Sequence, residues 1–133
     1  MISVSDFINA VQYAANTVTR YEWGKQCEDG ACDCIGLVKE GYERAGGKWT
    51  GLNGTNWAAR NMMQSLHAIS PGNLLDGMVV FKLRAPGTAY YDLPDAYKSD
   101  QDQNDYYHIG VVVSINPVQI LHCTSVPGGI KID

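Results

Sequence analysis

A cysteine at the start of a short amphipathic segment is the feature that most constrains the fold of this chain. Residues 33–38 read DCIGLV and follow the turn-forming segment DGAC at 29–32. Apolar residues after Cys34 recur at the spacing of one helical face until a Gly-Gly pair, so we predict a helix over residues 34–45. Cys34 would then lie in the first helical turn. Unpaired backbone N–H groups and the helix dipole favour the nucleophilic thiolate there.

Two histidines provide a candidate base for this cysteine. His108 begins the β-branched run HIGVVV, and His122 lies in a second apolar run at 118–124, beyond the turn-forming pair Asn116-Pro117. Antiparallel pairing around this turn would place His108 opposite His122 or one diagonal step away. Their even separation keeps both on one face if neither strand carries a bulge. One imidazole could take the thiol proton while the other orients it, as in a catalytic triad.

Several segments, in the same order along the chain, resemble the motifs of NlpC/p60 cysteine peptidases. That family has a Tyr-x-Trp-Gly-Gly motif, Asp-Cys-Ser-Gly-Leu-Val at its nucleophile, and three strands of the types Pro-Gly-Asp-Leu-Val-Phe-Phe, His-Val-Gly-Ile-Tyr and Ile-His-Ala-Ser. The matching segments here are YEWG at 21–24, DCIGLV at 33–38, LDGMVVF at 75–81, HIGVV at 108–112 and LHCT at 121–124. The resemblance therefore covers the chain from about Tyr21 to its end.

This resemblance implies an α+β, papain-like fold in which N-terminal helices pack on a small antiparallel sheet. It also implies hydrolysis of bacterial peptidoglycan peptides, usually at the bond from γ-D-glutamate to the diamino acid. Cys34 matches the family's nucleophile, His108 its base and His122 the orienting residue. Tyr21 matches a tyrosine whose hydroxyl lies at the active site and helps to hold the oxyanion. Asp33 is the other candidate substrate or oxyanion residue, although its simplest role is that of a helix N-cap.

The sequence departs from the family pattern without losing a catalytic group. Ile35 replaces the serine after the nucleophile, Lys25 replaces the second glycine after the tryptophan, and the two histidines are slightly further apart than in the family. These differences bear on substrate preference more than on chemistry. Trp23 is expected to be a core aromatic residue. No metal and no cofactor are implied.

Composition fits one globular domain spanning residues 1–133. The hydrophobic content is 45%, charged residues make up 18%, and the net charge is −4. The absence of a basic run argues against a nucleic-acid partner, and no apolar run approaches the roughly 18–20 residues of a membrane span. No secretory signal is visible. The expected partner is bacterial peptidoglycan, and the sequence gives no oligomeric state.

A wall hydrolase without a visible signal must still reach the wall. We expect a phage protein associated with the tail or released at lysis, or else the mature fragment of a secreted enzyme. Residues 130–132 read as a strand at which the sequence stops, so we expect the N-terminal part of a longer protein.

Other interpretations remain open at this stage. The chain could be a CHAP-like amidase that cuts between muramic acid and alanine, or an inactive wall-binding or phage tail module in which Cys34 is a buried structural thiol. Zinc bound by Cys34 and the two histidines would quench the nucleophile. Cys27 and Cys32 are the local candidates for a disulfide.

Further elements are predicted outside the motifs. We expect a first helix with Ser5 as its N-cap, a third helix from Thr55 or Asn56 to Leu66, and a strand over residues 78–83. Residues 84–107 form an unusually long connection with five tyrosines and five aspartates. Because this connection ends at His108, we expect it to be a substrate-binding wall or lid, or else a tolerated surface insertion.

Overall fold

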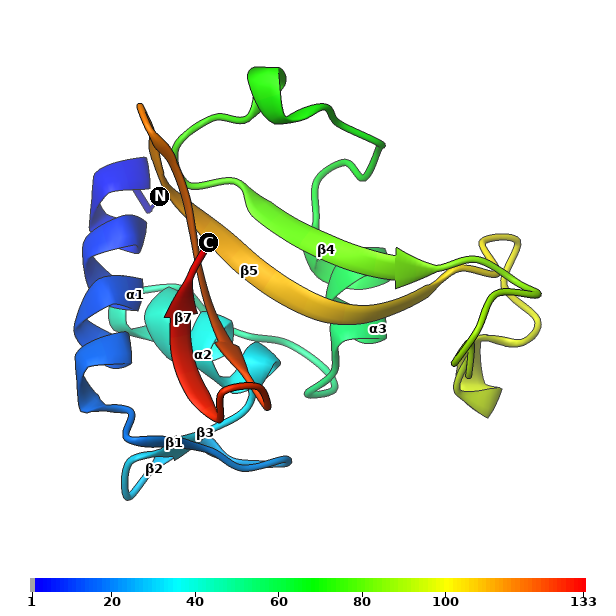
Figure 1. Cartoon of the computed structure of the whole chain (residues 1–133), viewed down its shortest axis with the longest axis horizontal. Coiled ribbons are helices and arrows are strands. Elements are labelled where there is room, and N and C mark those ends of the chain that lie inside the picture. Colours follow the sequence, from blue (N-terminus) through cyan, green and yellow to red (C-terminus); the bar gives the residue numbers. More distant parts are fainter. Residues whose placement is uncertain (1) are drawn as a thin grey trace.

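The computed structural model describes residues 2–133 and has helices packed on a four-stranded antiparallel sheet, which confirms the mixed α+β class (Figure 1). The papain-like arrangement within that class stays a prediction. The helices are α1 (Val4–Thr17), α2 (Cys34–Arg44) and α3 (Thr55–Trp57), the last continued by a π-helical turn at Ala58–Met62. The strands are β1 (Arg20–Tyr21), β2 (Gln26–Glu28), β3 (Ala31–Cys32), β4 (Val79–Arg84), β5 (Asp105–Ile115), β6 (Val118–Thr124) and β7 (Gly129–Ile132).

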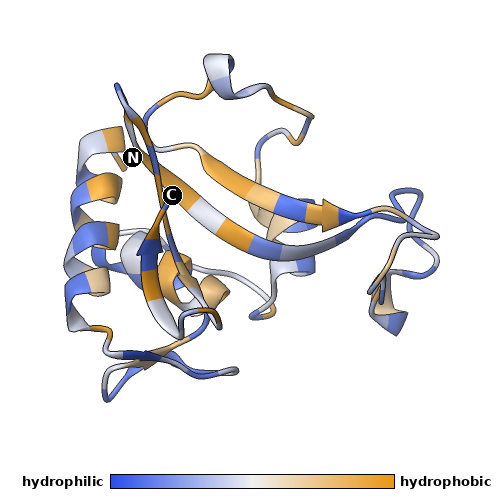
Figure 2. Cartoon of the chain, in the orientation of Figure 1, coloured by the Kyte–Doolittle hydropathy of each residue, from blue (hydrophilic) through white to orange (hydrophobic). Residues whose placement is uncertain are grey.

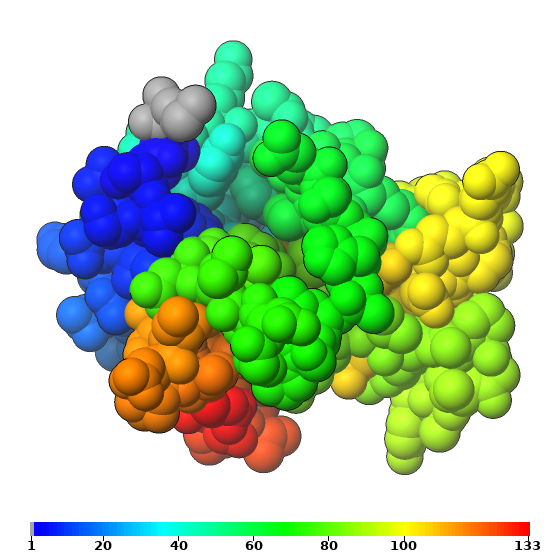
Figure 3. Space-filling view, turned by 90° about the horizontal axis from the view of Figure 1, so that it is seen from above, coloured from blue at the N-terminus to red at the C-terminus, as the bar shows by residue number. Residues whose placement is uncertain are grey.

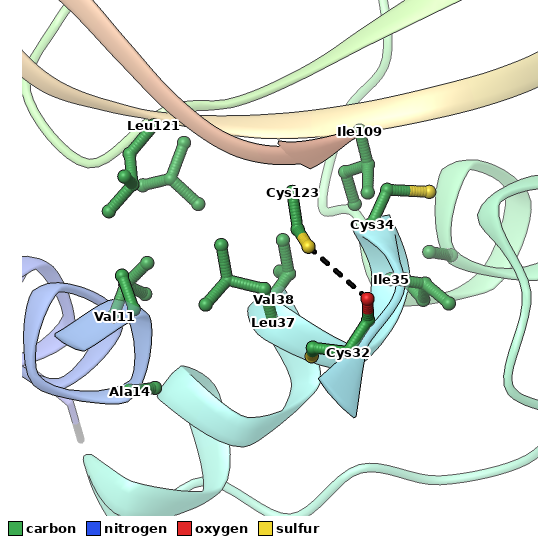
Figure 4. Packing of buried hydrophobic residues seen from close by; sticks show 13 residues of the cluster. Val11, Ala14, Cys32, Cys34, Ile35, Leu37, Val38, Ile109, Leu121 and Cys123 are labelled. Atoms are coloured by element: carbon green, nitrogen blue, oxygen red, sulfur yellow. Dashed lines mark hydrogen bonds between the residues drawn. The ribbon is translucent and has the colours of Figure 1, made fainter. Parts of the chain in front are cut away.

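The main sheet has the order β4-β5-β6-β7, and β1, β3 and β2 form a small separate sheet. One face of β5 and β6 packs on α2, with α1 beside it (Figure 4). Apolar and polar residues follow one another around α1, as expected for a helix with one buried face (Figure 2). The centre of β5 is instead buried on both faces, since Val111 and Val112 are both fully buried. The fully buried core residues include Val11, Leu37, Ile109, Val111 and Cys123.

The helix predicted over residues 34–45 is present as α2, and the first helix starts earlier than expected. Asp33 is the N-cap of α2, and its side chain accepts a hydrogen bond from the backbone N–H of Gly36. Helix α1 begins at Val4 because Ser3, not Ser5, accepts the capping hydrogen bond from the Asp6 backbone. Both caps satisfy N–H groups that a helix start leaves unpaired.

The third helix is shorter than predicted, and β4 is shifted by one residue. Helical structure ends at Met62, because Met63 has extended backbone angles. Beyond that point Leu66 and Ile69 remain 39% and 38% exposed, so a continued helix would bury no apolar face. Strand β4 covers Val79–Arg84 instead of residues 78–83.

A bulge in the β5–β6 hairpin decides where the two histidines point. Next to the turn, Ile115 pairs with Val118, whereas beyond a shift at Val113 the pairing is Val112 with Ile120. Without that shift, every even-numbered residue of β5 would pair with an odd-numbered residue of β6. His108 and His122 would then lie on opposite faces of the sheet. The expectation that the even separation keeps both histidines on one face when neither strand carries a bulge was therefore wrong. The extra residue is what puts both histidines on one face.

The long connection at 85–104 is an ordered lobe that projects beyond the ends of β4 and β5 (Figures 1 and 3). It contains a short 3-10 turn at Asp95–Tyr97. The guanidinium of Arg60 donates to the backbone oxygens of Asp102, at 2.7 Å, and Asn104, at 3.0 Å. The lobe extends away from α1 and α2 in Figure 1, so it would have to move to cover Cys34. Its role as a lid stays a prediction.

Candidate active site

Three polar side chains on one face of the sheet form a continuous hydrogen-bonded chain. His108 Nε2 lies 2.7 Å from His122 Nδ1, and His122 Nε2 lies 2.6 Å from Asp133 Oδ2. The two rings are nearly perpendicular, with their centroids 5.0 Å apart. Asp133 directly follows β7, and its backbone exchanges two hydrogen bonds with Ile120, which puts it on the same face as His122.

Gly110 makes room for this chain of side chains. The pairing of Val111 with Leu121 places Gly110 opposite His122 and His108 one diagonal step away. A Cβ atom at Gly110 would lie 2.9 Å from Ile120 Cγ2 and 3.3 Å from His122 Cβ. The glycine after Ile109 is thus required because the His122 side chain passes close to the backbone on its way to His108.

The hydrogen bonds fix the tautomers of both rings. Hydrogen bonds from His122 and Lys131 hold the pKa of Asp133 below its usual range, so its carboxylate is ionised and only accepts. His122 must then carry its proton on Nε2, and its Nδ1 accepts from His108 Nε2. This leaves an unshared electron pair on His108 Nδ1. Burial, followed by smaller electrostatic contributions from His122 and Lys82, lowers the pKa of His108 to about 4 and keeps the ring neutral.

Cys34 is the first residue of α2 and lies against β5 next to Ile109 (Figure 4). Its side chain is buried, with 9% of the residue exposed. Burial, followed by the negative charge of Asp33, raises the pKa of the Cys34 thiol to about 11, although hydrogen bonds from the backbone of Ile109 and Ile35 act in the opposite direction. The expected thiolate is therefore wrong for this conformation. Desolvation outweighs the N-terminal helix position, and the thiol stays protonated at neutral pH.

Cys34 contacts Ile109, the residue after His108, but the Cys34 and His108 side chains are not hydrogen-bonded to each other. Within residues 2–133, no hydrogen bond connects the Cys34 thiol with His108 or His122. Ile109 packs in the core with Cys34, and alternation along the strand turns His108 toward the opposite face of β5. The catalytic roles of Cys34, His108 and His122 stay predictions.

Asp33 serves as a structural link between the helix and the preceding loop. Its Oδ1 accepts from the Gly36 backbone at 2.7 Å, and its Oδ2 accepts from the Gly24 backbone at 3.0 Å. Its predicted N-cap role is confirmed by the first of these bonds. Its role as a substrate or oxyanion residue stays a prediction.

Tyr21 lies on β1, near the nucleophile helix. Burial, then the negative charges of Cys34 and Asp33, raises the pKa of Tyr21 to about 12. Its hydroxyl therefore remains protonated and able to donate a hydrogen bond. The expectation that Trp23 belongs to the core is wrong, because this residue is 84% exposed. It sits at the tip of a turn in which Gly24 has φ +85°, a conformation that favours glycine.

The remaining cysteines form no disulfide. Cys27, Cys32, Cys34 and Cys123 are all free thiols, so the candidate Cys27–Cys32 disulfide is not found. Cys123 is fully buried, and its thiol donates to the Cys32 carbonyl at 3.2 Å (Figure 4). Across residues 2–133, no group of three or more ligating side chains is placed to hold a metal ion.

Two cavities, of about 270 and 770 Å³, lie alongside β4, and neither is lined by Cys34, His108 or His122. No helix in the described part of the chain is long and apolar enough to cross a membrane.

Asp133 is the site residue that the sequence did not reveal. Its place depends on the pairing of β6 with β7, which sets Leu121 opposite Ile132 and carries Asp133 alongside Ile120. The strand expected at 130–132 was a signal for this pairing. The side chain that follows it could have been considered as a partner for a histidine.

Comparisons with known proteins return no family. No protein-family model matches the chain, and no curated protein is significantly similar to it. The NlpC/p60 resemblance therefore rests on the motifs themselves.

Proposed function

We propose that this chain is a cysteine hydrolase of peptidoglycan stem peptides that cleaves the bond from γ-D-glutamate to the diamino acid on an NlpC/p60-like, papain-like fold. The observation that supports this most is the hydrogen-bonded chain His108–His122–Asp133, which begins one residue from the Cys34 contact on β5. An imidazole oriented through its second nitrogen is the arrangement expected of a general base.

The proposed reaction passes through an acyl-enzyme. The Cys34 thiol gives its proton to His108 Nδ1 while sulfur attacks the peptide carbonyl, and the C–N bond breaks as His108 returns the proton to the leaving amine. Water then attacks the thioester, its proton passes through His108 to the sulfur, and the acid is released. The Tyr21 hydroxyl and the Cys34 backbone N–H are the proposed oxyanion donors.

This mechanism requires a rearrangement of the thiol. Sulfur and Nδ1 have to approach to roughly 3 Å, a distance that catalytic pairs often reach only with substrate bound. Because Cys34 and His108 lie on opposite faces of β5, the proposal requires the start of this strand to shift as well as both side chains to rotate. We propose a phage origin, with delivery by the virion or release at lysis, because a wall hydrolase needs a route to its substrate.

Digestion of purified peptidoglycan tests the proposal. Lysine-type and diaminopimelate-type walls are incubated with the wild type and with Cys34→Ala, and the released fragments are identified by mass spectrometry. New termini at the γ-glutamyl bond from the wild type alone support the proposal. Termini between muramic acid and alanine would instead indicate the CHAP-like amidase. Equal release by Cys34→Ala would exclude a Cys34 mechanism.

A second candidate is an inactive wall-binding or tail module. It is favoured by the protonated thiol and by the lack of a hydrogen bond from Cys34 to a histidine in the described residues. Cosedimentation with intact walls, without release of fragments from either wall type, would support this second function.

A further inference from the structure

We propose that Asp133 is a positioning residue that selects the tautomer of His122 and thereby leaves His108 Nδ1 free to act as the base. This inference rests on the proposed function, in which His108 takes the Cys34 proton. Asp133 would act only through His122, because the contact it makes is to the outer nitrogen of that ring.

The carboxylate is held so that one oxygen is directed at His122. The backbone of Asp133 is tied to Ile120 by hydrogen bonds of 2.8 and 3.0 Å. Lys131 Nζ lies 3.2 Å from Oδ1, and His122 Nε2 lies 2.6 Å from Oδ2. Each carboxylate oxygen therefore has its own partner, and the sheet fixes the position from which Asp133 reaches the ring.

The His122 ring itself has little access to water. Only 5% of the residue is exposed, so solvent cannot readily replace a missing partner. A neutral imidazole exists in two tautomers, and the hydrogen bond at one nitrogen decides which is present. The Asp133 carboxylate can only accept, which forces the proton onto His122 Nε2.

The tautomer of His122 decides whether His108 can be a base toward Cys34. With the proton on Nε2, His122 accepts from His108 Nε2, and the electron pair of His108 is on Nδ1. With the proton on Nδ1, His122 would donate to His108 Nε2 instead. His108 would then carry its own proton on Nδ1 and could not accept one from the thiol there.

Nitrogen-15 NMR of the imidazole rings in the full chain tests this directly. The wild type should show Nε2-protonated tautomers for both His108 and His122. In Asp133→Asn the amide group can donate as well as accept, so His122 should shift toward the Nδ1-protonated form. Hydrolysis of stem peptides should fall about 10²- to 10³-fold in kcat, with KM changed less than threefold, by analogy with the loss of an orienting carboxylate in other triads.

A matched variant separates positioning from a general effect of replacing a carboxylate by an amide. Asp29→Asn makes the same substitution at an exposed aspartate between β2 and β3 and should keep both tautomers and a kcat within about threefold of the wild type. Asp133→Glu should recover part of the kcat lost in Asp133→Asn. It also serves as the test variant if Asp133→Asn does not fold.

The outcomes distinguish this inference from the proposed function. Unchanged tautomers and kcat in Asp133→Asn would overturn the positioning role while leaving hydrolysis by the wild type intact. If the wild type hydrolyses nothing, a tautomer shift in Asp133→Asn would still establish the positioning role, and the failure would fall on the proposed function. No shift would overturn the role in that case as well.

Discussion

Burial of Cys34 raises the pKa of its thiol by more than the position at a helix N-terminus lowers it. The helix N-terminus favours negative charge, but the thiol is packed against β5, and burial and the negative charge of Asp33 disfavour the thiolate. If Cys34 is the proposed nucleophile, a thiol that loses its proton only when an imidazole approaches would be protected from oxidation between turnovers. Reactivity would then depend on substrate binding.

The first prediction concerns the reactivity of this thiol. Because burial raises the pKa of Cys34 to about 11, alkylation by iodoacetamide should accelerate steadily between pH 7 and 10 without reaching a plateau. Peptide mapping by mass spectrometry distinguishes Cys34 from the other three cysteines, and Cys34→Ala is the blank. A plateau below pH 8 would contradict this and indicate a thiolate paired with a charged imidazole.

The second prediction concerns stability in acid. The pKa of His108 is about 4 in the folded state against 6.5 for an ordinary histidine, so the unfolded chain takes up its proton first as the pH falls. Stabilisation by neutral His108 is complete above pH 6.5 and lost as the pH falls toward 4. One pKa unit corresponds to about 1.4 kcal/mol, and partial exposure reduces the total, so we expect a loss of about 1 to 2 kcal/mol.

Urea unfolding of the wild type and His108→Gln at pH 7, 5.5 and 4 measures this loss. The wild type should lose more free energy of unfolding than the variant over this range. Parallel pH profiles for the two proteins would show that His108 is not buried in its neutral form.

At the scale of secondary-structure elements, the backbone pairing of β5 with β6 positions the side chains of His108 and His122. The third prediction is that Gly110→Ala displaces His122, because the new Cβ would lie 2.9 Å from Ile120 Cγ2 and 3.3 Å from His122 Cβ. We expect a loss of about 1 to 3 kcal/mol, as for other overpacked positions, and loss of the Nε2-protonated tautomer of His108.

Thermal unfolding and the same nitrogen-15 spectra measure both effects. Gly72→Ala is the matched control, since a Cβ there meets no atom within 4 Å and should change neither. A Gly110→Ala protein with wild-type spectra would show that the strands have room for the extra methyl group.

Local sequence patterns predicted the helix and strands of the candidate site better than the register in which the strands pair. The α2 helix, its Asp33 cap and both histidine strands follow from apolar periodicity and turn residues, which are local properties. The bulge at Val113 could not be predicted, because it depends on how the turn at Asn116-Pro117 sets the register. The end of the π-helical turn at Met62 likewise depends on which side of this segment the rest of the protein covers.

At the scale of the whole molecule, one arginine joins the projecting lobe to the body. The Arg60 side chain is 8% exposed and binds the backbone of residues 102 and 104. It also donates to Asn56 Oδ1 at 2.7 Å, and Asn56 in turn donates to Asp105 at the start of β5. Apart from the Arg60–Asn56 bond, these contacts link residues more than 40 positions apart, which is why no sequence pattern indicated them.

The fourth prediction is that Arg60→Ala loosens the lobe. The variant removes the donor to two partly buried carbonyl oxygens, and hydrogen bonds to charged groups contribute about 1.5 to 3 kcal/mol each. Hydrogen exchange of residues 85–104 should accelerate at least tenfold. Lys98→Ala, which removes only an exposed ion pair with Asp95, should leave exchange outside its own turn unchanged. Wild-type protection in Arg60→Ala would mean that the lobe is held by its other contacts.

The proposed function requires Cys34 to form a covalent acyl intermediate with a peptidoglycan stem peptide. The most direct measurement is rapid acid quenching of the protein with a purified stem peptide, followed by mass spectrometry of the intact chain and of its Cys34 peptide. We predict a transient mass increase equal to the acyl part of the peptide, located on Cys34 and absent from Cys34→Ala. Cleavage of the γ-glutamyl bond without any adduct on Cys34, and at the same rate in Cys34→Ala, would contradict it.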